Sequence, residues 1–391
     1  MTSTPSVARE KNPALHNASS FESVALLLQG GGALAAYQAG VYEALHEAEV
    51  VPDWVGGISM GAVNGAIIAG NKPADRLSKL RDFWDSLTEA PQQWFLDMVT
   101  PFVKQGGEPA RTAWDHLSAA STMMRGVPGF FEPRVPPPWL SAPGSFDATS
   151  FYDTREFKKT LERFVDFNIL NDGKIRYTTS AVNVRSGNYA NFDTLAQKMG
   201  PEHVMASGAL PPGLPAVEID GQDYWDGGLI SNTPLQWIMD DSSKDTLIFQ
   251  VDLWSARGEF PKDIAGVMTR QKEIQYSSRT RAITDHFRRT QKLRHAFIKL
   301  YDQLPENLKK SPEAQSIIKA CDEYHVYNIV HLIYRAKGYE GYSKDAQFSQ
   351  LSMREHWKAG RDDTRHSLRH KEVLARPDDH EGVRIFDLTR D

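Results

Sequence analysis

The pattern of apolar and polar positions alternates between two periods along the first part of the chain. Residues 24–29 form a short, almost wholly apolar run that ends in glycines, which is typical of a strand buried in a parallel sheet. Residues 33–48 then repeat apolar side chains at helical spacing. A second strand signal at 52–55 leads into a glycine-rich turn and a helix-forming run. The first seventy residues therefore predict a layered α/β fold.

The same alternation continues through the middle of the chain. An amphipathic helix is predicted over 153–167, and strands over 175–184 and 189–192 flank a predicted hairpin turn. A short helix is predicted over 201–207 and one more buried strand over 246–251. These elements extend the α/β pattern.

Residues 91–150 interrupt this pattern. They are rich in Pro, Trp, Phe and Met and show no clear period. We interpret them as an insertion over the functional site, part helical and part loop. The sequence leaves open whether this insertion is a lid that contacts a substrate or an irregular cover of the core.

The pattern changes again in the C-terminal third, where strand signals stop and residues 262–301 and 311–335 carry helical spacing. At the other end, residues 1–20 are polar and lack the apolar stretch of a signal peptide. We therefore expect a disordered lead-in over 1–20, a catalytic body over 21–255 and a helical C-terminal region over 256–391.

Composition narrows the functional classes. The 391 residues are 40% hydrophobic and 24% charged, as in an ordinary globular protein. The formal charge of −5 is too small to indicate a nucleic-acid partner. The single cysteine, Cys321, forms no internal disulfide, which fits a reducing compartment. No apolar run approaches the length of about 18 residues that a membrane span requires, and a cytoplasmic protein is expected.

Residues 57–61 read G-x-S-x-G around Ser59. A serine in this setting lies on a sharp strand-to-helix turn, and glycines flank it because a Cβ there would collide with neighbouring backbone. The helix-forming run at 62–69 supplies the expected context. The motif alone also fits a glycine-rich helix start whose serine has no chemical role, so it needs partners.

A catalytic serine needs a base and hydrogen-bond donors for the oxyanion that forms. Gly30, Gly31 and Gly32 follow the first predicted strand and open a helix. Several free N–H groups and the positive end of the helix dipole therefore point the same way. These glycines are candidates for an oxyanion hole.

The glycine loop has a second interpretation. Residues 30–35 also fit the dinucleotide fingerprint G-x-G-x-x-A, with Glu49 or Asp53 as the acidic residue that follows. This alternative predicts a nucleotide-binding Rossmann-like protein. It leaves Ser59 and its glycines unexplained.

Asp226 is the candidate base. It ends a short predicted strand, and the two glycines after it let the turn approach a neighbour closely, although Asp-Gly is also common in plain hairpin turns. A Ser-Asp-His triad is the alternative arrangement. Its candidate histidines lie in sequence that we interpret as helical, whereas a triad histidine normally follows the last strand: His286, His295, His325 and His331.

Together, residues 30–33, 57–61 and 226–228 resemble the motifs of the patatin-like phospholipases. That family has a glycine-rich oxyanion loop, a G-x-S-x-G turn and a D-G-G/A motif, in this order, and works with a Ser-Asp dyad and no histidine. The resemblance covers roughly residues 21–255 and extends to the Ala-Ser-Gly-Ala-Leu-Pro stretch at 206–211. It implies a three-layer α/β/α sandwich with a mostly parallel central sheet.

The resemblance also implies roles. Ser59 would be the nucleophile and Asp226 the base, acting through an acyl-enzyme without a cofactor or metal. The oxyanion hole would be formed by the backbone N–H groups of Gly30, Gly31, Gly32 and Met60. The implied activity is hydrolysis of carboxylic esters of lipids, of the phospholipase A or lysophospholipase type. An esterase of the same mechanism acting on other esters, such as hydroxyacid oligomers, remains the alternative.

Two features lie outside this pattern. Many family members carry Arg and then Gly after the oxyanion glycines, where this chain has Leu34 and Ala35. The loop therefore lacks the cation that would favour an anionic phospholipid headgroup. Residues 327–360 resemble an extension found on some bacterial patatin-like proteins.

Residues 270–300 predict a basic amphipathic helix. They hold nine Lys or Arg and two acids, Glu273 and Asp285, and their apolar residues fall broadly on one helical face. Such a helix can lie on an anionic membrane surface, which would place the protein peripherally on the inner face of the membrane. Packing on the catalytic body with a solvated basic face is the alternative.

Overall fold

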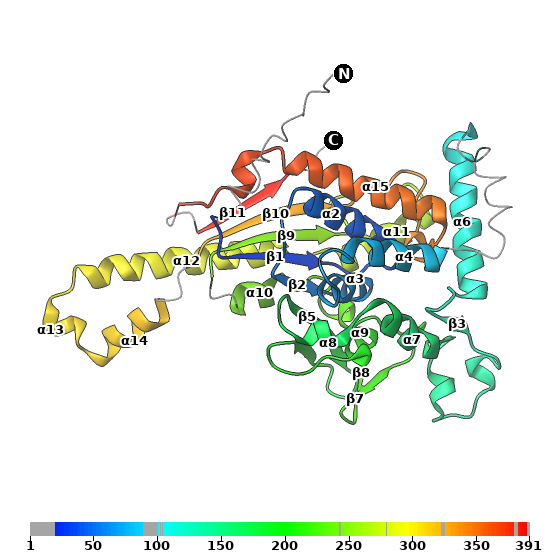
Figure 1. The fold of residues 1–391 in the computed structure, drawn as a ribbon, viewed down its shortest axis with the longest axis horizontal. Coiled ribbons are helices and arrows are strands. Elements are labelled where there is room, and N and C mark those ends of the chain that lie inside the picture. Colours follow the sequence, from blue (N-terminus) through cyan, green and yellow to red (C-terminus); the bar gives the residue numbers. More distant parts are fainter. Residues whose placement is uncertain are drawn as a thin grey trace, which may run out of the picture.

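The computed structural model describes residues 20–88, 101, 103, 105–241, 244–278, 280–321, 325–378 and 382–388 (Figure 1). Residues 1–19 of the expected lead-in and 91–100 of the insertion lie outside the described residues.

A nine-stranded sheet runs through the described part of the chain, in the order β11-β10-β9-β1-β2-β5-β8-β7, with β6 on the other edge of β5. Its strands are β1 (Ser23–Leu28), β2 (Trp54–Gly57), β5 (Arg176–Asn183), β6 (Tyr189–Asp193), β7 (Val217–Ile219), β8 (Gln222–Asp226), β9 (Thr246–Asp252), β10 (Tyr327–Ile333) and β11 (Val383–Asp387). Neighbours from β11 to β5 are parallel, whereas β6, β7 and β8 pair antiparallel. The mostly parallel sheet is confirmed.

Helices cover both faces of the sheet, and the alternating side chains of β1 show which helices pack on each face. Leu26 and Leu28 of β1 join the core formed with α2 (Ala36–Glu47), α3 (Met60–Ala69), α4 (Arg76–Thr88) and α15 (Gln350–Ser367). Ala25 and Leu27 point the other way, to α10 (Leu235–Asp241) and α12 (Thr280–Asp302). Because successive side chains of a strand point to opposite faces, the two cores define the predicted three-layer α/β/α sandwich.

The sheet continues into the C-terminal region. β10 pairs in parallel with the whole length of β9, and β11 pairs with β10. The prediction that strands stop near residue 255 is therefore wrong. The helix predicted over 311–335 is confirmed for Pro312–Cys321, but residues 327–333 form a strand instead. The apolar run at 327–333 is too short to distinguish a strand from a buried helix by its pattern, and pairing with β9 decides its conformation. The C-terminal region is thus not only helical.

The insertion lies at the edge of the sheet where the parallel strands end. Its long helix α6 (Gly107–Arg125) stands at this edge in Figure 1. It is followed by a two-stranded pair, β3 (Glu132–Pro133) with β4 (Tyr152–Asp153), and by α7 (Arg155–Phe164). Arg111 of α6 donates to Ser352 and forms an ion pair with Glu355, both on α15. The insertion is therefore fastened to the C-terminal region.

The predicted basic helix is divided in two. α11 (Ile264–Tyr276) ends before α12 begins at Thr280. The inner half of α12 packs on the sheet through Phe287, whereas its outer half runs beyond the amino ends of the strands. α13 (Glu306–Lys309) and α14 (Pro312–Cys321) fold back beside it, and we call residues 280–321 the arm (Figure 1). Among the described helices, none has the length and apolar character needed to cross a membrane.

The remaining described α-helices are short: α8 (Phe167–Asn171) and α9 (Pro201–Ser207). The bounds of α9 are those predicted from the sequence. It packs on β5, β7 and β8, next to the serine turn.

Candidate active site

The glycine loop and the serine turn leave the sheet at the same level. Strands β1 and β2 are parallel neighbours, with Leu28 opposite Gly57. Gly30 and Ser59 each lie two residues further along their strands. A Cβ on Gly30 would lie 3.1 Å from the Cβ of Ser59, so the loop lies directly against the serine.

Strand β8 brings Asp226 to the same place from the opposite direction. Gly57 of β2 is opposite Thr179 of β5, and two residues further on Ala181 of β5 is opposite Asp226. β6 pairs with residues 178–182 of β5 and so occupies its other edge. β8 therefore continues the line of β2 along one edge of β5, and Asp226 arrives at the end of β2 beside Ser59.

Ser59 is held in a backbone conformation that serine rarely adopts. Its φ is 55° and its ψ is −126°, and such conformations persist only where the surroundings impose them. The Ser59 N–H donates to both the carbonyl oxygen and the hydroxyl of Ser207. A Cβ on Gly57 would lie 2.3 Å from the Gly61 carbonyl oxygen, and one on Gly61 2.2 Å from that of Leu28. The turn can form only with glycine on both sides of the serine.

Asp226 is a buried carboxylate, 2% exposed. Its Oδ1 accepts the Gly228 N–H at 2.7 Å, and its side chain shares a hydrogen bond with Ser59. Burial raises the pKa of Asp226 to about 7, although these two hydrogen bonds lower it. Tyr224 and Trp225, the two residues that precede Asp226, remain partly exposed.

The candidate oxyanion donors differ in whether their backbone N–H groups already have an acceptor. The Gly30 N–H donates to the Asn232 carbonyl oxygen at 3.4 Å. Within the described residues we find no acceptor for the backbone N–H of Gly31, Gly32 or Met60. Met60 begins α3 and Gly32 begins a 3-10 helix, so neither N–H has an intrahelical partner. Three free donors therefore remain beside the serine.

The histidines of the alternative triad lie elsewhere. His331 is in β10, where it pairs with Asp252, and His325 precedes β10 and lies 3.8 Å from Asp245. The sequence expectation of helix for these two residues is wrong, because both belong to the C-terminal extension of the sheet. His286 is exposed on α12 and His295 lies on its outer half. None of these four histidines is among the groups that shift the pKa of Asp226.

The acidic residues of the dinucleotide interpretation lie at the wrong edge of the sheet. Asp53 accepts hydrogen bonds from the Ser23 hydroxyl and the Val24 N–H, at the amino end of β1. Glu49 lies in the turn that follows α2, before β2 begins. The glycine loop is at the carboxyl end of β1, so neither residue can meet a ribose bound there, and the dinucleotide alternative is contradicted.

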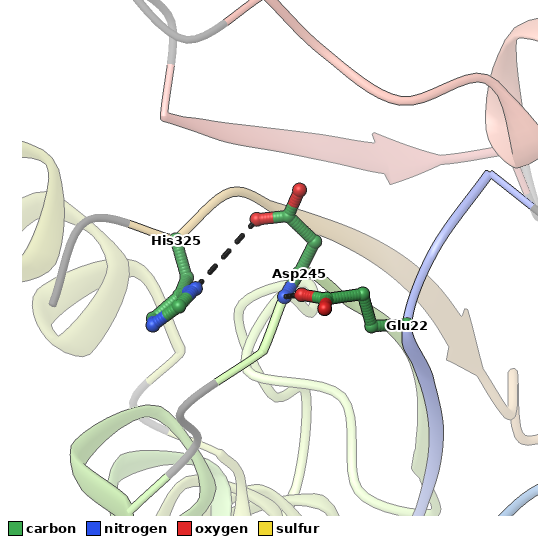
Figure 2. A group of neighbouring side chains, drawn as sticks. All are labelled: Glu22, Asp245 and His325. Carbon is green, nitrogen blue, oxygen red and sulfur yellow. Dashed lines mark hydrogen bonds and ion pairs between the residues drawn. The ribbon is translucent and has the colours of Figure 1, made fainter.

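One group of potential metal ligands lies in the described part of the chain, at Glu22, Asp245 and His325 (Figure 2). Its carboxylates already have partners. Glu22 accepts the Asp245 N–H at 3.0 Å, and Asp245 accepts the Val326 N–H and forms an ion pair with Arg376. These bonds tie together the amino ends of β1, β9 and β10, which accounts for the group without an ion.

Comparison with protein-family models identifies the fold family. The model described as patatin-like phospholipase matches residues 26–236, more than half of the chain. The chain belongs to the patatin-like phospholipase family. A second model, described as patatin phospholipase, matches residues 274–380, so a patatin-type model also covers most of the C-terminal region. Members of this family are lipid ester hydrolases.

Two curated relatives of this patatin-like chain are much longer proteins. Neuropathy target esterase sws of Drosophila persimilis is 25% identical over 215 residues, which are 54% of this chain and 12% of that protein. Patatin-like phospholipase domain-containing protein 6 of Homo sapiens is 37% identical over 79 residues, 20% of this chain and 6% of that protein. The chain thus spans about an eighth or less of these relatives.

The similarity of this chain to two solved structures is low. VipD from Legionella pneumophila is 14% identical with a TM-score of 0.36, over 90% of this chain and 67% of that one. The type III effector protein ExoU is 13% identical with a TM-score of 0.32, over 91% and 54%. The strand order described above, rather than these likenesses, establishes the fold class of this patatin-like protein.

Sequence reasoning missed the residues that hold the site from behind. Ser207 fixes the serine turn, and Asn232 and Trp254 hold the glycine loop. Gln29, just before the loop, accepts the N–H groups of Leu253 and Trp254. One sequence signal was available: Gln29 is a polar residue at the end of an apolar strand. Ser207 lies within the stretch that resembles the family, without a role assigned to it.

Proposed function

We propose that this protein hydrolyses carboxylic esters of lipids through an acyl-enzyme on Ser59. The observation that carries the proposal is the pairing of the Ser59 hydroxyl with the buried Asp226 carboxylate beside three free backbone N–H groups. A hydroxyl, a base and oxyanion donors at one point are the parts that acyl transfer requires.

The residues divide the reaction between them. Asp226 takes the proton of the Ser59 hydroxyl as its Oγ attacks the ester carbonyl carbon, and the N–H groups of Gly31, Gly32 and Met60 stabilise the oxyanion. Asp226 then gives this proton to the alcohol oxygen as the ester bond breaks. The alcohol departs and the acyl group stays bound to Ser59 as the acyl-enzyme. Water then attacks the acyl carbon while Asp226 accepts a proton from it. The bond between the acyl carbon and the Ser59 Oγ breaks, Asp226 returns the proton to Oγ, and the carboxylic acid leaves. A pKa of about 7 suits this base better than an ordinary carboxylate pKa.

A small apolar cavity, about 10 Å³ in volume, lies near the serine, and it would have to widen to receive an acyl chain. It is lined mainly by apolar side chains of the insertion, α7, α9 and the following loop: Phe130, Phe157, Met205, Ala209, Leu214 and Val217. Gly208 also lines it, and a Cβ on Gly208 would lie 3.9 Å from the Ser59 Oγ. One residue of the cavity wall thus borders the nucleophile.

The glycine loop carries no cationic side chain that could bind an anionic headgroup. Leu34, at the position where many family members carry Arg, is fully buried in the core. Phospholipids are therefore one class of substrate among lipid esters, and esters without a phosphate, including hydroxyacid oligomers, fit the same site.

The arm supports contact with an anionic lipid surface. It holds nine Lys or Arg and four Asp or Glu, a net charge of +5 on a chain of −5. Leu293, Phe297 and Leu300 are exposed on its outer half, at helical spacing. The arm extends from the amino ends of the strands, away from the catalytic edge (Figure 1). It is therefore suited to anchoring the protein and not to feeding lipid into the site.

Labelling with a fluorophosphonate probe, combined with hydrolysis of short- and long-chain chromogenic esters, tests the function. Ser59→Ala should abolish labelling and turnover, and Asp226→Asn should reduce both severely. Ser78→Ala and Asp172→Asn, at exposed positions, are the matched controls and should behave as wild type.

Each other outcome has a definite meaning. Normal turnover by a folded Asp226→Asn variant would assign the base to another residue. A wild-type protein that is neither labelled nor active on any ester would exclude the hydrolase.

A further inference from the structure

The carbonyl of Gly30 is held by two buried side chains. The Asn232 Nδ2 and the Trp254 Nε1 each donate to its oxygen at 2.9 Å. Both side chains are almost fully buried. A carbonyl oxygen has two lone pairs, so both of its acceptor positions are filled.

These two bonds also determine where the Gly31 N–H points. The peptide bond between Gly30 and Gly31 is trans, and in a planar trans peptide the C=O and the following N–H point in opposite directions. Donors that hold the Gly30 oxygen towards the protein interior therefore direct the Gly31 N–H away from it. Three consecutive glycines have no side chains to restrict their own backbone, so this orientation must be imposed from outside the loop.

Asn232 is in turn fixed by the C-terminal region. Its Nδ2 also donates to the carbonyl oxygen of Tyr276, the last residue of α11, at 3.0 Å. The Gln29 Nε2 donates to the same oxygen at 3.1 Å, and the Gln29 Oε1 accepts the N–H groups of Leu253 and Trp254. One carbonyl of the C-terminal region thus anchors both amide side chains that flank the glycine loop.

We propose that Asn232 and Trp254 are positioning residues of the oxyanion hole, and that the C-terminal region completes this device through the Tyr276 carbonyl. The proposal rests on the proposed function, because the direction of the Gly31 N–H matters only if an oxyanion forms beside Ser59. An oxyanion donor acts mainly in the transition state. Its misplacement should therefore lower kcat and leave KM nearly unchanged.

Trp254→Phe is the decisive variant, because it keeps an aromatic ring and removes the Nε1–H. Trp54→Phe is its matched control: Trp54 is also buried, and its Nε1 donates to Thr178 at 3.1 Å at the amino end of β2. We expect kcat of Trp254→Phe to fall about tenfold to a hundredfold, since a small misplacement costs up to roughly a hundredfold. KM should stay within about twofold and Trp54→Phe should keep wild-type kcat.

A second readout separates positioning from loss of stability. An alkyl trifluoromethyl ketone adds to a serine as a tetrahedral adduct whose oxygen occupies the oxyanion hole. Its inhibition constant should rise in Trp254→Phe by the same factor by which kcat/KM falls. In Trp54→Phe, the inhibition constant should not change, even if its thermal unfolding temperature drops by as much as that of Trp254→Phe.

The result that overturns the proposal is a folded Trp254→Phe variant with wild-type kcat, or equal losses in Trp254→Phe and Trp54→Phe. If Trp254→Phe does not fold, Asn232→Ser takes its place, because a serine side chain is too short to reach the Gly30 oxygen, and wild-type kcat in that variant overturns the proposal equally. A wild-type protein without turnover overturns the proposed function as well. Loss of kcat in Trp254→Phe and Asn232→Ser, with wild-type kcat in Trp54→Phe, supports the positioning role.

Discussion

Gly40 of α2 and Gly360 of α15 meet where the two helices cross. A Cβ on Gly40 would lie 1.9 Å from the carbonyl oxygen of Trp357, and a Cβ on Gly360 would lie 1.9 Å from that of Tyr37. Each glycine thus rests on the backbone of the other helix. This reciprocal contact joins the helix that follows the glycine loop to the C-terminal region.

The substitution Gly360→Ala should destabilise the protein. An alanine gains about 1 kcal/mol of helix propensity, but forcing the helices apart in a packed core typically costs about 1–3 kcal/mol. With a contact this close, we expect a net loss, measured by urea unfolding. Gly341→Ala is the control, because the nearest atom to its Cβ would be at an ordinary 3.5 Å. An unchanged unfolding midpoint for Gly360→Ala would show that the helices separate freely.

Activity should rise with pH through about 7. Burial raises the pKa of Asp226 to about 7, and the base must be ionised to accept the proton of Ser59. The profile of kcat/KM against pH should therefore show an acidic limb near that value. A flat profile from about pH 4 to 9, the range in which such a base titrates, would contradict the assignment.

Stability should show the opposite trend at this residue. The pKa of folded Asp226 lies above its ordinary value, so folding takes up a proton between about pH 4 and 7 and the ionised carboxylate is costly above that range. Asp226→Asn should therefore raise the unfolding temperature relative to wild type, and by more at pH 8 than at pH 5. Comparing variant and wild type at each pH cancels Asp115, whose pKa burial also raises to about 7. An equal difference at both pH values would contradict the raised pKa.

The apolar cavity should set acyl-chain preference. Phe130→Ala removes one of its walls, and we expect the ratio of long-chain to short-chain ester kcat/KM to fall several-fold, because a buried aromatic contact is lost. Phe146→Ala in the same insertion, where the ring is 58% exposed, is the control. Equal effects on both chain lengths would exclude Phe130 from the acyl site.

Binding to anionic vesicles should depend on the arm. The exposed Lys292 and Lys299 on α12 are each worth about 1 kcal/mol near an anionic surface. Charge reversal of both to Glu should weaken co-sedimentation at least tenfold and leave turnover of a soluble ester unchanged. Lys174→Glu with Lys198→Glu, exposed on the catalytic body, is the control. Equal binding by all three proteins would remove the membrane contact.

The sequence was most informative where the chemistry is local. The turn around Ser59 and the loop of Gly30 to Gly32 depend on glycines next to each other in the chain, and both could be read directly. Their proximity to Asp226 depends on the registers in which β2, β5 and β8 pair, and the sequence pattern does not specify these registers. Asn232 and Trp254 are more than 200 residues from the carbonyl that they hold. No local pattern could reveal their position.

The C-terminal strands show a different limit. Residues 327–333 follow several helices and include polar side chains such as Asn328 and His331, which obscure a strand pattern. Asn328 donates to the carbonyl oxygens of Val373 and Ala375, and His331 pairs with Asp252. Both polar side chains have partners from other elements, so their presence in a strand becomes intelligible only in the folded chain.

The pairing of β10 with β9 also affects how the chain avoids aggregation. Every residue of β9 from Thr246 to Asp252 is buried, and β10 covers its full length. A chain shortened to end near residue 255 would present this apolar strand as an open edge, which can pair with the same edge of another molecule. The C-terminal region therefore closes the sheet on that side, and the shorter α/β body would be prone to self-association.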